Sequence, residues 1–167
     1  MALTIDLVRL DDAPALSQLL VACVRDGASV GFLADVTLAD ADRFWASHLR
    51  TQGLVVLAAR AEGQLVGTVT AWPSGKRNAA HRVEVVKLLV SPSARWRGVG
   101  RALMRQLDRV ARERGWSLLL LDTQQDSPAQ RLYEAEGWTV FGIVPGHAAT
   151  PEGGLAPTAF MYKQLKP

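Results

Sequence analysis

The sequence predicts an α/β domain built on a mixed sheet of about six or seven strands, with helices on both faces. Apolar segments typical of strands alternate with segments of helical periodicity along nearly the whole chain of 167 residues. At its centre, strands at 85–90 and 118–121 are apolar on both sides, as buried parallel strands are, and a helix separates them. The length suits one domain, here 1–167, with a substantial core.

The first half is expected to hold one strand, two helices and a hairpin. The strand covers LTIDLVRL at 3–10, and Pro14 suits the first turn of the helix that follows. A second helix is predicted over about 39–50, where Phe44, Trp45 and Leu49 would face inward. Next, LVVLAARA and QLVGTVTAW flank Glu62-Gly63, which is typical of a hairpin turn.

The second half is expected to begin with a strand and a helix, to repeat that pair, and to end with two further strands. Their ranges are about 82–90, 98–114, 116–123, 127–137, 139–144 and 158–164.

Composition favours a cytoplasmic protein with one local anionic ligand. The net charge is only +3, and arginines concentrate between 95 and 114, which argues against a nucleic-acid surface. Neither a membrane span nor a secretory signal is evident. The single cysteine, Cys23, excludes a disulfide framework, and the histidines lack metal-ligand spacing, so no metal is expected. Either a monomer or a homodimer is compatible with the sequence.

A basic, glycine-containing loop, Arg95-Trp96-Arg97-Gly98-Val99-Gly100, precedes the third predicted helix. A helix start exposes unpaired backbone N–H groups and the positive end of the helix dipole, and glycines let a ligand approach that backbone closely. Such a segment is suited to bind phosphate. A Walker loop would need Lys-Ser/Thr where Arg101-Ala102 stands, and a dinucleotide fingerprint would need glycine in place of Leu103.

This loop resembles the Gln/Arg-x-x-Gly-x-Gly/Ala segment of the GNAT acyltransferase superfamily, and AQRLYEAEGW downstream resembles its second signature. The resemblance implies a GNAT fold that uses acetyl-CoA, with its acetyl group admitted where two central strands splay apart. It also implies that the loop holds the pyrophosphate and that the preceding strand faces the pantetheine arm. The corresponding residues here are Leu88, Leu89, Val90, Arg95, Arg97, Gly98, Val99, Gly100 and Arg101. Asp126 stands where the second signature often carries asparagine.

A narrower resemblance covers 82–165, where VEVVKLLVSPSAR, LLLLDT and PGHAATPEGGLAPTAFMYKQL are similar to the tabtoxin-resistance acetyltransferases. Those enzymes carry a glutamate and an aspartate at positions that match Glu84 and Asp122. The N-terminal third, which helps to form the acceptor pocket in GNAT folds, resembles them less clearly.

Acetyl transfer to an amine assigns a chemical task to each candidate catalytic residue. The amine must lose a proton before it attacks, and Glu84 is expected to be a partly desolvated base that works through a water molecule. Val86, Leu88 and Val90 are expected on its side of the strand. Asp122, at the carboxyl end of its strand, could attract the cationic amine or share the proton transfer.

Three further residues are assigned around this site. Tyr133 lies where many GNAT enzymes keep the acid that protonates the leaving thiolate. His147 is expected near the acceptor pocket, and Trp72 could line it or simply pack. Arg105, Arg109 and Arg112 are interpreted as a solvated helix face paired with Asp108 and Glu113.

The sequence thus predicts direct acetyl transfer from acetyl-CoA to a small amino-acid-like amine, a reaction that could detoxify a toxin or antibiotic. Acetylation of a protein N-terminus or lysine is a second hypothesis. A non-catalytic acyl-CoA sensor is a third, and the joint presence of Glu84, Asp122 and Tyr133 argues against it.

Overall fold

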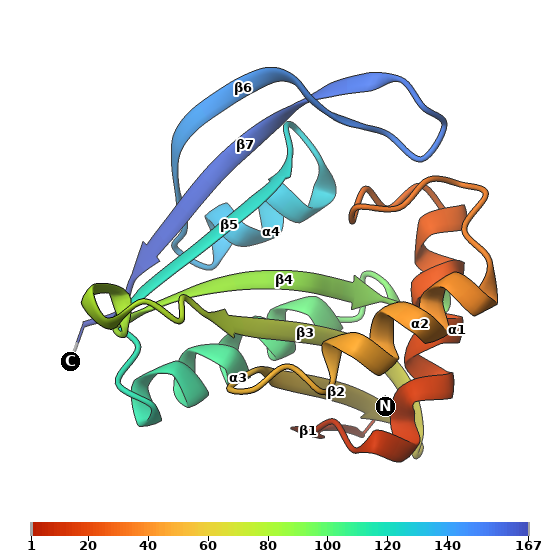
Figure 1. Cartoon of the computed structure of the whole chain (residues 1–167), viewed down its shortest axis with the longest axis horizontal. Coiled ribbons are helices and arrows are strands. Elements are labelled where there is room, and N and C mark those ends of the chain that lie inside the picture. The colour runs from red at the N-terminus through yellow and green to blue at the C-terminus, as the bar shows by residue number, and fades with distance from the viewer. Residues whose placement is uncertain (1, 167) are drawn as a thin grey trace.

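Seven strands form one mixed sheet in the order β1-β2-β3-β4-β5-β7-β6 (Figure 1). A computed structural model describes residues 2–166. The strands are β1 (Leu3–Leu7), β2 (Val55–Ala61), β3 (Gln64–Pro73), β4 (Arg82–Val90), β5 (Leu118–Gln124), β6 (Thr139–Ala149) and β7 (Leu155–Gln164). The helices are α1 (Ala13–Arg25), α2 (Leu38–His48), α3 (Val99–Glu113) and α4 (Pro128–Ala135). The predicted order of strands and helices and the predicted α/β class are confirmed, although β6 and β7 extend further toward their shared turn than expected.

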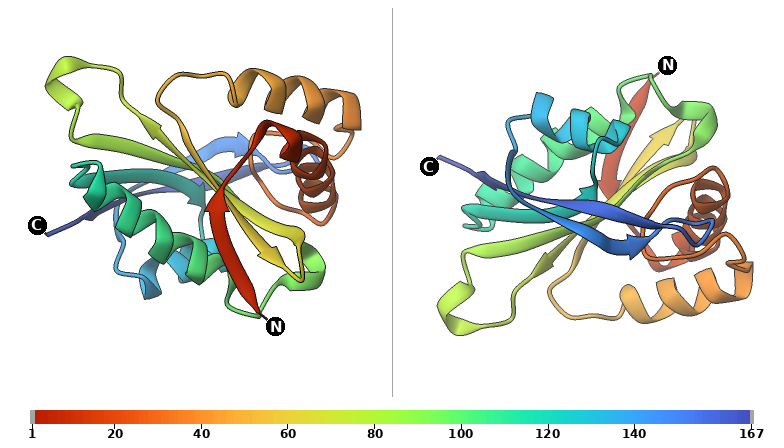
Figure 2. Two further views of the ribbon diagram at one scale, coloured as in Figure 1. Left: turned by 90° about the horizontal axis from the view of Figure 1, so that it is seen from below. Right: turned by 90° about the horizontal axis from the view of Figure 1, so that it is seen from above.

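Helices cover both faces of the sheet (Figure 2). On one face, called here the α1–α2 face, the two N-terminal helices bury a core centred on Leu16, Leu20 and Trp45. On the other, the α3–α4 face, Leu103, Leu107 and further apolar side chains pack against the central strands. Burial of this apolar surface is the main force that holds both layers to the sheet.

Local sequence signals set the helix starts. Thr37 accepts a hydrogen bond from the backbone N–H of Asp40, and the Asp40 carboxylate accepts one from the backbone of Thr37, which forms a reciprocal cap on α2. Ser127 caps α4 with its hydroxyl, which accepts a hydrogen bond from the N–H of Gln130. Gly98 precedes α3 with a φ of 81°, a left-handed conformation that favours glycine.

The central parallel strands β4 and β5 separate soon after they meet. Their ladder joins Arg82 to Leu118 and ends with Glu84 opposite Leu120. Beyond that pair the strands diverge, and Figure 1 shows them opening away from each other. This splay leaves the facing edges of the two strands without a ladder, so their backbone groups are available to a ligand.

A bulge in β4 corrects one prediction. Val69 on β3 spans two residues of β4, because Thr68 pairs with Leu89 and Thr70 pairs with Val86. Lys87 lies in this bulge with a φ of 55°. The bulge turns the later side chains over, so Leu88 and Val90 pack with the α3–α4 core instead of sharing the side of Glu84. Only Val86 stays on the side of Glu84, because a strand pattern read from sequence assumes an uninterrupted period of two.

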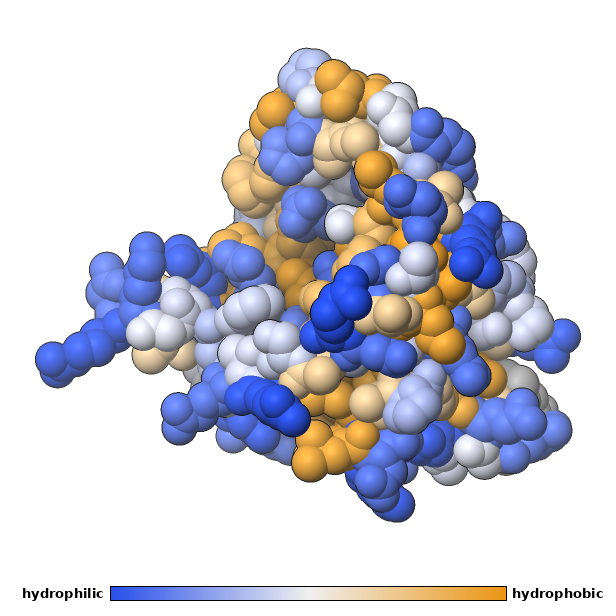
Figure 3. Space-filling model, turned by 45° about the vertical axis from the view of Figure 1, so that its right-hand side comes forward, coloured by the Kyte–Doolittle hydropathy of each residue, from blue (hydrophilic) through white to orange (hydrophobic). Residues whose placement is uncertain are grey.

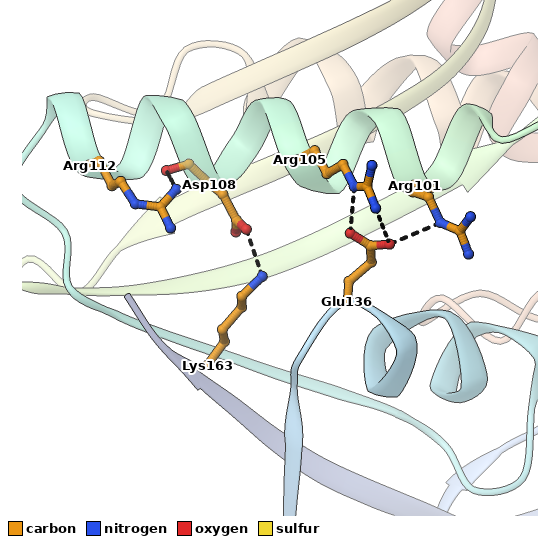
Figure 4. Close-up of polar contacts among 6 residues, drawn as sticks. All are labelled: Arg101, Arg105, Asp108, Arg112, Glu136 and Lys163. Atoms are coloured by element: carbon orange, nitrogen blue, oxygen red, sulfur yellow. Dashed lines mark hydrogen bonds and ion pairs between the residues drawn. The ribbon is translucent and has the colours of Figure 1, made fainter. Parts of the chain in front are cut away.

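Charged side chains fasten α3 to the C-terminal part of the fold (Figure 4). The Glu136 carboxylate, just after α4, forms ion pairs with Arg101 and Arg105, whose Nε atoms both lie 2.9 Å from it. The Lys163 ammonium lies 2.6 Å from Oδ2 of Asp108. These partners replace the expected pairing of the arginine face with Asp108 and Glu113, because sequence spacing cannot show which charges the tertiary fold brings to the helix.

No helix within residues 2–166 is long and apolar enough to cross a membrane.

Candidate functional site

Strand pairing places the two predicted catalytic carboxylates on one face of the sheet. Glu84 lies opposite Trp72 of β3 and Leu120 of β5, and residues directly opposite each other share a face. Asp122 is two residues beyond Leu120 and therefore projects to the same side. Val83 and Val85 belong to the α3–α4 core, so this shared side is the α1–α2 face. The carboxylates thus lie on the two strands that form the splay.

Both carboxylates are open to solvent. Glu84 and Asp122 are each exposed, which corrects the expectation that Glu84 is partly desolvated. The charge of Asp122 nevertheless acts on two buried groups. It raises the pKa of Lys87, which burial lowers, and it further raises the pKa of Tyr133, which burial also raises. The Asp122 carboxylate is therefore close enough to influence both the bulge of β4 and helix α4.

Tyr133 lies on the α3–α4 side of the sheet. It is 7% exposed, belongs to the α3–α4 core, and its ring centroid lies 5.9 Å from that of Trp138. Burial, together with the Asp122 carboxylate, raises the pKa of the Tyr133 hydroxyl well above its usual range. The hydroxyl therefore stays protonated at neutral pH, as a proton donor must.

The start of α3 combines open space with close packing. A side-chain carbon added to Gly98 would meet no heavy atom within 4 Å, so a ligand can approach the backbone there. One added to Gly100 would lie 3.0 Å from Cδ2 of Leu132 on α4. Gly100 is therefore needed to pack α3 against α4, and a bulky substitution there would change the packing as well as any ligand contact.

Arg95 is already engaged within the protein. Its guanidinium pairs with the Asp26 carboxylate after α1, and its Nε donates to the Val90 carbonyl at 3.3 Å. The same carbonyl accepts the thiol of Cys23 at 3.3 Å. Arg97, by contrast, is exposed beside the start of α3. Of the two loop arginines, Arg97 is the one free to reorient toward an anion.

Phe44, His48 and Trp72 form an aromatic wall on the α1–α2 face, of which the sequence analysis named Phe44 and Trp72 but not His48. His48 stacks on Phe44 with centroids 4.8 Å apart and lies 5.5 Å from the ring of Trp72, which is 43% exposed. Its Nε2 shares a hydrogen bond of 3.2 Å with Oγ1 of Thr70. Since Trp72 pairs with Glu84, this wall borders the predicted base. The spacing of Phe44 and His48, four residues apart on one helix, could have predicted that their rings lie side by side.

The buried imidazole of His48 predicts acid sensitivity. Burial, with a smaller effect from the Lys87 charge, lowers the pKa of His48 to about 4. An unfolded chain takes up that proton near pH 6.5, so lowering the pH from about 6.5 to about 4 favours unfolding. Up to about 2 kcal/mol of stability should disappear by pH 5. Urea unfolding at pH 7 and pH 5 should show a smaller loss for His48→Phe, and an equal loss would contradict this prediction.

Lys87 is the second residue that the sequence analysis missed. Its Nζ donates to the Val30 carbonyl at 2.8 Å and lies 5.2 Å from the Phe44 ring centroid. Burial lowers the pKa of Lys87 while the Asp122 carboxylate raises it. The lysine inside the apolar run VEVVKLLV could have marked this position, because a charge in a central strand costs free energy unless a partner compensates for it.

Two loops meet on the side of the molecule toward which β4 and β5 open (Figure 1). The N–H of Ala34, between α1 and α2, donates to the Pro151 carbonyl in the β6–β7 turn at 2.9 Å. His147 on β6 shares a hydrogen bond of 3.1 Å with Thr158, and its ring lies 5.1 Å from that of Phe160, which pairs with Asp122. Figure 3 shows the surface hollowed below its upper part, where Figure 1 places β6 and β7.

The fold places the predicted residues on elements around the parting strands. Glu84 and Asp122 lie on one face of the two strands that part, Tyr133 lies in the core on the opposite face, and the loop from Arg95 to Gly100 leads into α3. Within residues 2–166, no group of three or more His, Cys, Asp or Glu side chains is arranged to hold a metal ion.

Comparison with known proteins agrees with this geometry. The model of the acetyltransferase (GNAT) family matches residues 13–138, which is more than half of the chain. Several solved structures share the fold over nearly their whole length.

Three of these structures illustrate the range. Ribosomal-protein-alanine N-acetyltransferase from Brucella melitensis is 26% identical with a TM-score of 0.80, covering 97% of this chain and 99% of that one. YncA from Salmonella typhimurium, solved with its cofactor acetyl-CoA, is 21% identical with a TM-score of 0.82 and coverages of 99% and 95%. A structure provisionally assigned as a phosphinothricin N-acetyltransferase is 20% identical with a TM-score of 0.84 and coverages of 99% and 100%.

The splay of β4 and β5 fits a thioester arm between the strands, and the open backbone at Gly98 fits a phosphate at the start of α3. Together with the family match over 13–138, these features lead to one conclusion. The chain belongs to the acetyltransferase (GNAT) family and is an acetyl-CoA-dependent N-acetyltransferase.

Proposed function

We propose that the acceptor is the amine of a small, amino-acid-like molecule. The observation that carries this proposal is the hydrogen bond between Ala34 and Pro151, which joins the α1–α2 and β6–β7 loops on the side of the molecule toward which β4 and β5 open. A bridge at this place limits the room for an extended peptide, whereas a small molecule needs no groove. The similarity of 82–165 to tabtoxin-resistance acetyltransferases supports the same acceptor class.

Acetyl-CoA supplies the acetyl group as a thioester, and the residues predicted from sequence are suited to hold it. The free N–H groups at Val99, Gly100 and Arg101 begin α3, and the helix dipole there favours an anion. Arg97 adds a mobile positive charge. Along β4, the backbone of Leu88 and Leu89 is proposed to face the pantetheine. Val90 contributes less, because its carbonyl already accepts two donors.

Charge reversal of Arg97 tests this arrangement. In Arg97→Glu, a carboxylate replaces a cation beside the pyrophosphate, so the Kd for acetyl-CoA should rise about tenfold or more. Arg109→Glu is the matched control, since it changes the net charge equally on an exposed position further along α3. Calorimetric titration should show little change for Arg109→Glu. Equal weakening by both substitutions would indicate a general charge effect and remove Arg97 from the cofactor site.

Two side chains are proposed to move the protons of the reaction, and a third to attract the amine. Glu84 accepts a proton from the cationic amine through a water molecule, which its exposed position allows. Asp122, on the same face, attracts that cation. As the new C–N bond forms and the C–S bond breaks, the Tyr133 hydroxyl donates its proton to the leaving sulfur. The amide nitrogen then loses its remaining extra proton through water, which reprotonates the Tyr133 oxygen.

Acetylation of a protein N-terminus is the second candidate, favoured by the 26% identity to the enzyme from Brucella melitensis, whose name states that reaction. An acetyl-CoA consumption assay separates the candidates. Free amino acids and related small amines should be acetylated with a kcat/KM at least about tenfold above that of short peptides with the same N-terminal residue. A preference for peptides would reverse the assignment, and acetyl-CoA binding without turnover of any amine would favour the sensor. A cytoplasmic location remains a prediction.

A further inference from the structure

Lys87 occupies an unusual place at the point where the central strands part. It lies in the bulge of β4, three residues beyond Glu84, the last residue of that strand paired with β5. Its φ of 55° is a left-handed conformation that costs a residue other than glycine of the order of 1 kcal/mol. Such strain often marks a position that serves a site.

The half-buried side chain of Lys87 places its ammonium against the α1–α2 face. Its Nζ lies 2.8 Å from the Val30 carbonyl oxygen and 5.7 Å and 5.2 Å from the ring centroids of Phe32 and Phe44. An ammonium carries three N–H donors, and Val30 accepts one of them. Within residues 2–166 no carboxylate forms an ion pair with it, so two donors remain for a ligand or water.

Packing alone does not account for a charge at this position. A methionine side chain of similar length would fill the same space and avoid the loss of solvation of a cation. The attraction between the ammonium and the two ring faces offsets only part of that loss. Burial does lower the pKa of Lys87, which records that cost. The positive charge is therefore expected to meet a negative one when the site is filled.

The charges on this face match those of a zwitterion. Glu84 and Asp122 present negative charge along the α1–α2 face, and Asp122 is close enough to raise the pKa of Lys87. An α-amino acid carries its ammonium and carboxylate on one carbon. Its ammonium can lie toward the acidic side chains while its carboxylate meets the free donors of Lys87.

We propose that Lys87 binds the carboxylate of the acceptor and thereby selects free α-amino acids over amines and peptide N-termini that lack a carboxylate at that position. This assignment rests on the proposed small-molecule function. Lys87 is a specificity-determining residue that contacts the acceptor and takes no part in proton transfer. The Phe32 and Phe44 rings and the Val30 carbonyl hold its side chain in place.

The test compares each of the twenty amino acids with its α-amide, which keeps the amine and side chain but removes the negative charge. For the best acceptor, the wild-type protein should prefer the acid by about tenfold or more in kcat/KM. Lys87→Met should reduce that preference to about threefold or less, through a higher KM for the acid and an unchanged kcat for the amide. Lys87→Arg should keep most of the preference.

Binding provides a second readout. Calorimetric titration of the best amino acid into the protein saturated with CoA should show weaker binding for Lys87→Met, while the Kd for acetyl-CoA stays unchanged. Equal kcat/KM for acids and amides in the wild type, or equal losses on both in Lys87→Met, would overturn the assignment and make Lys87 structural. Acetylation of amines without a carboxylate preference would leave the proposed function standing. Failure to acetylate any amine would overturn both.

Discussion

Replacing Glu84 by glutamine is expected to lower kcat by about 10²-fold or more, because the amine then has no base to take its proton. The acidic limb of the pH–rate profile should disappear with the carboxylate. Glu84 is exposed, so the substitution should change the free energy of unfolding by less than about 0.5 kcal/mol. Steady-state kinetics across pH 5 to 9, with acetyl-CoA affinity measured alongside, check the prediction.

Asp122→Asn is the matched control, since it removes the same charge from the neighbouring strand on the same face. If the Asp122 carboxylate attracts the cationic amine, it acts on binding of the acceptor. This variant should therefore mainly raise the KM of the acceptor, most strongly for cationic acceptors. If Glu84→Gln keeps the acidic limb of its pH–rate profile and Asp122→Asn loses much of its kcat, then Asp122 is the base and Glu84 attracts the amine. Near-normal rates in both variants would mean that the amine arrives already deprotonated.

Tyr133→Phe should also reduce kcat about 10²-fold, the size of effect expected when a general acid is lost. The ring that packs against Trp138 is kept and only the hydroxyl goes. The raised pKa of Tyr133 keeps that hydroxyl protonated in the wild type throughout the usual working range of pH. Single-turnover kinetics should locate the loss in the chemical step.

Two control measurements separate an effect on the chemical step from an effect on the fold. The melting temperature and the Kd for acetyl-CoA should stay close to their wild-type values, because a buried tyrosine that loses only its hydroxyl keeps nearly all of its volume and its ring packing. If turnover is unchanged, water protonates the leaving thiolate and Tyr133 serves packing alone. If stability and turnover fall together, the effect belongs to the fold and not to the chemistry.

The sequence by itself determined the order of strands and helices, because that order follows from local apolar periodicity, caps and turn residues. The capping pair of Thr37 and Asp40 and the left-handed Gly98 are examples of signals that act within a few residues. The motif from Arg95 to Gly100 likewise identified the start of α3, because close approach of a phosphate needs particular residues at adjacent positions. Together with AQRLYEAEGW it indicated the family.

Only the tertiary structure decided which residues meet at the site. The bulge at Lys87 reversed the faces of Leu88 and Val90, since one extra residue shifts every later side chain of a strand to the other side. The engagement of Arg95 by Asp26 and of Arg101 by Glu136 depends on elements far apart in the chain. So does the contact of Lys87 with Val30, because charge and burial are set by neighbours that only folding brings together.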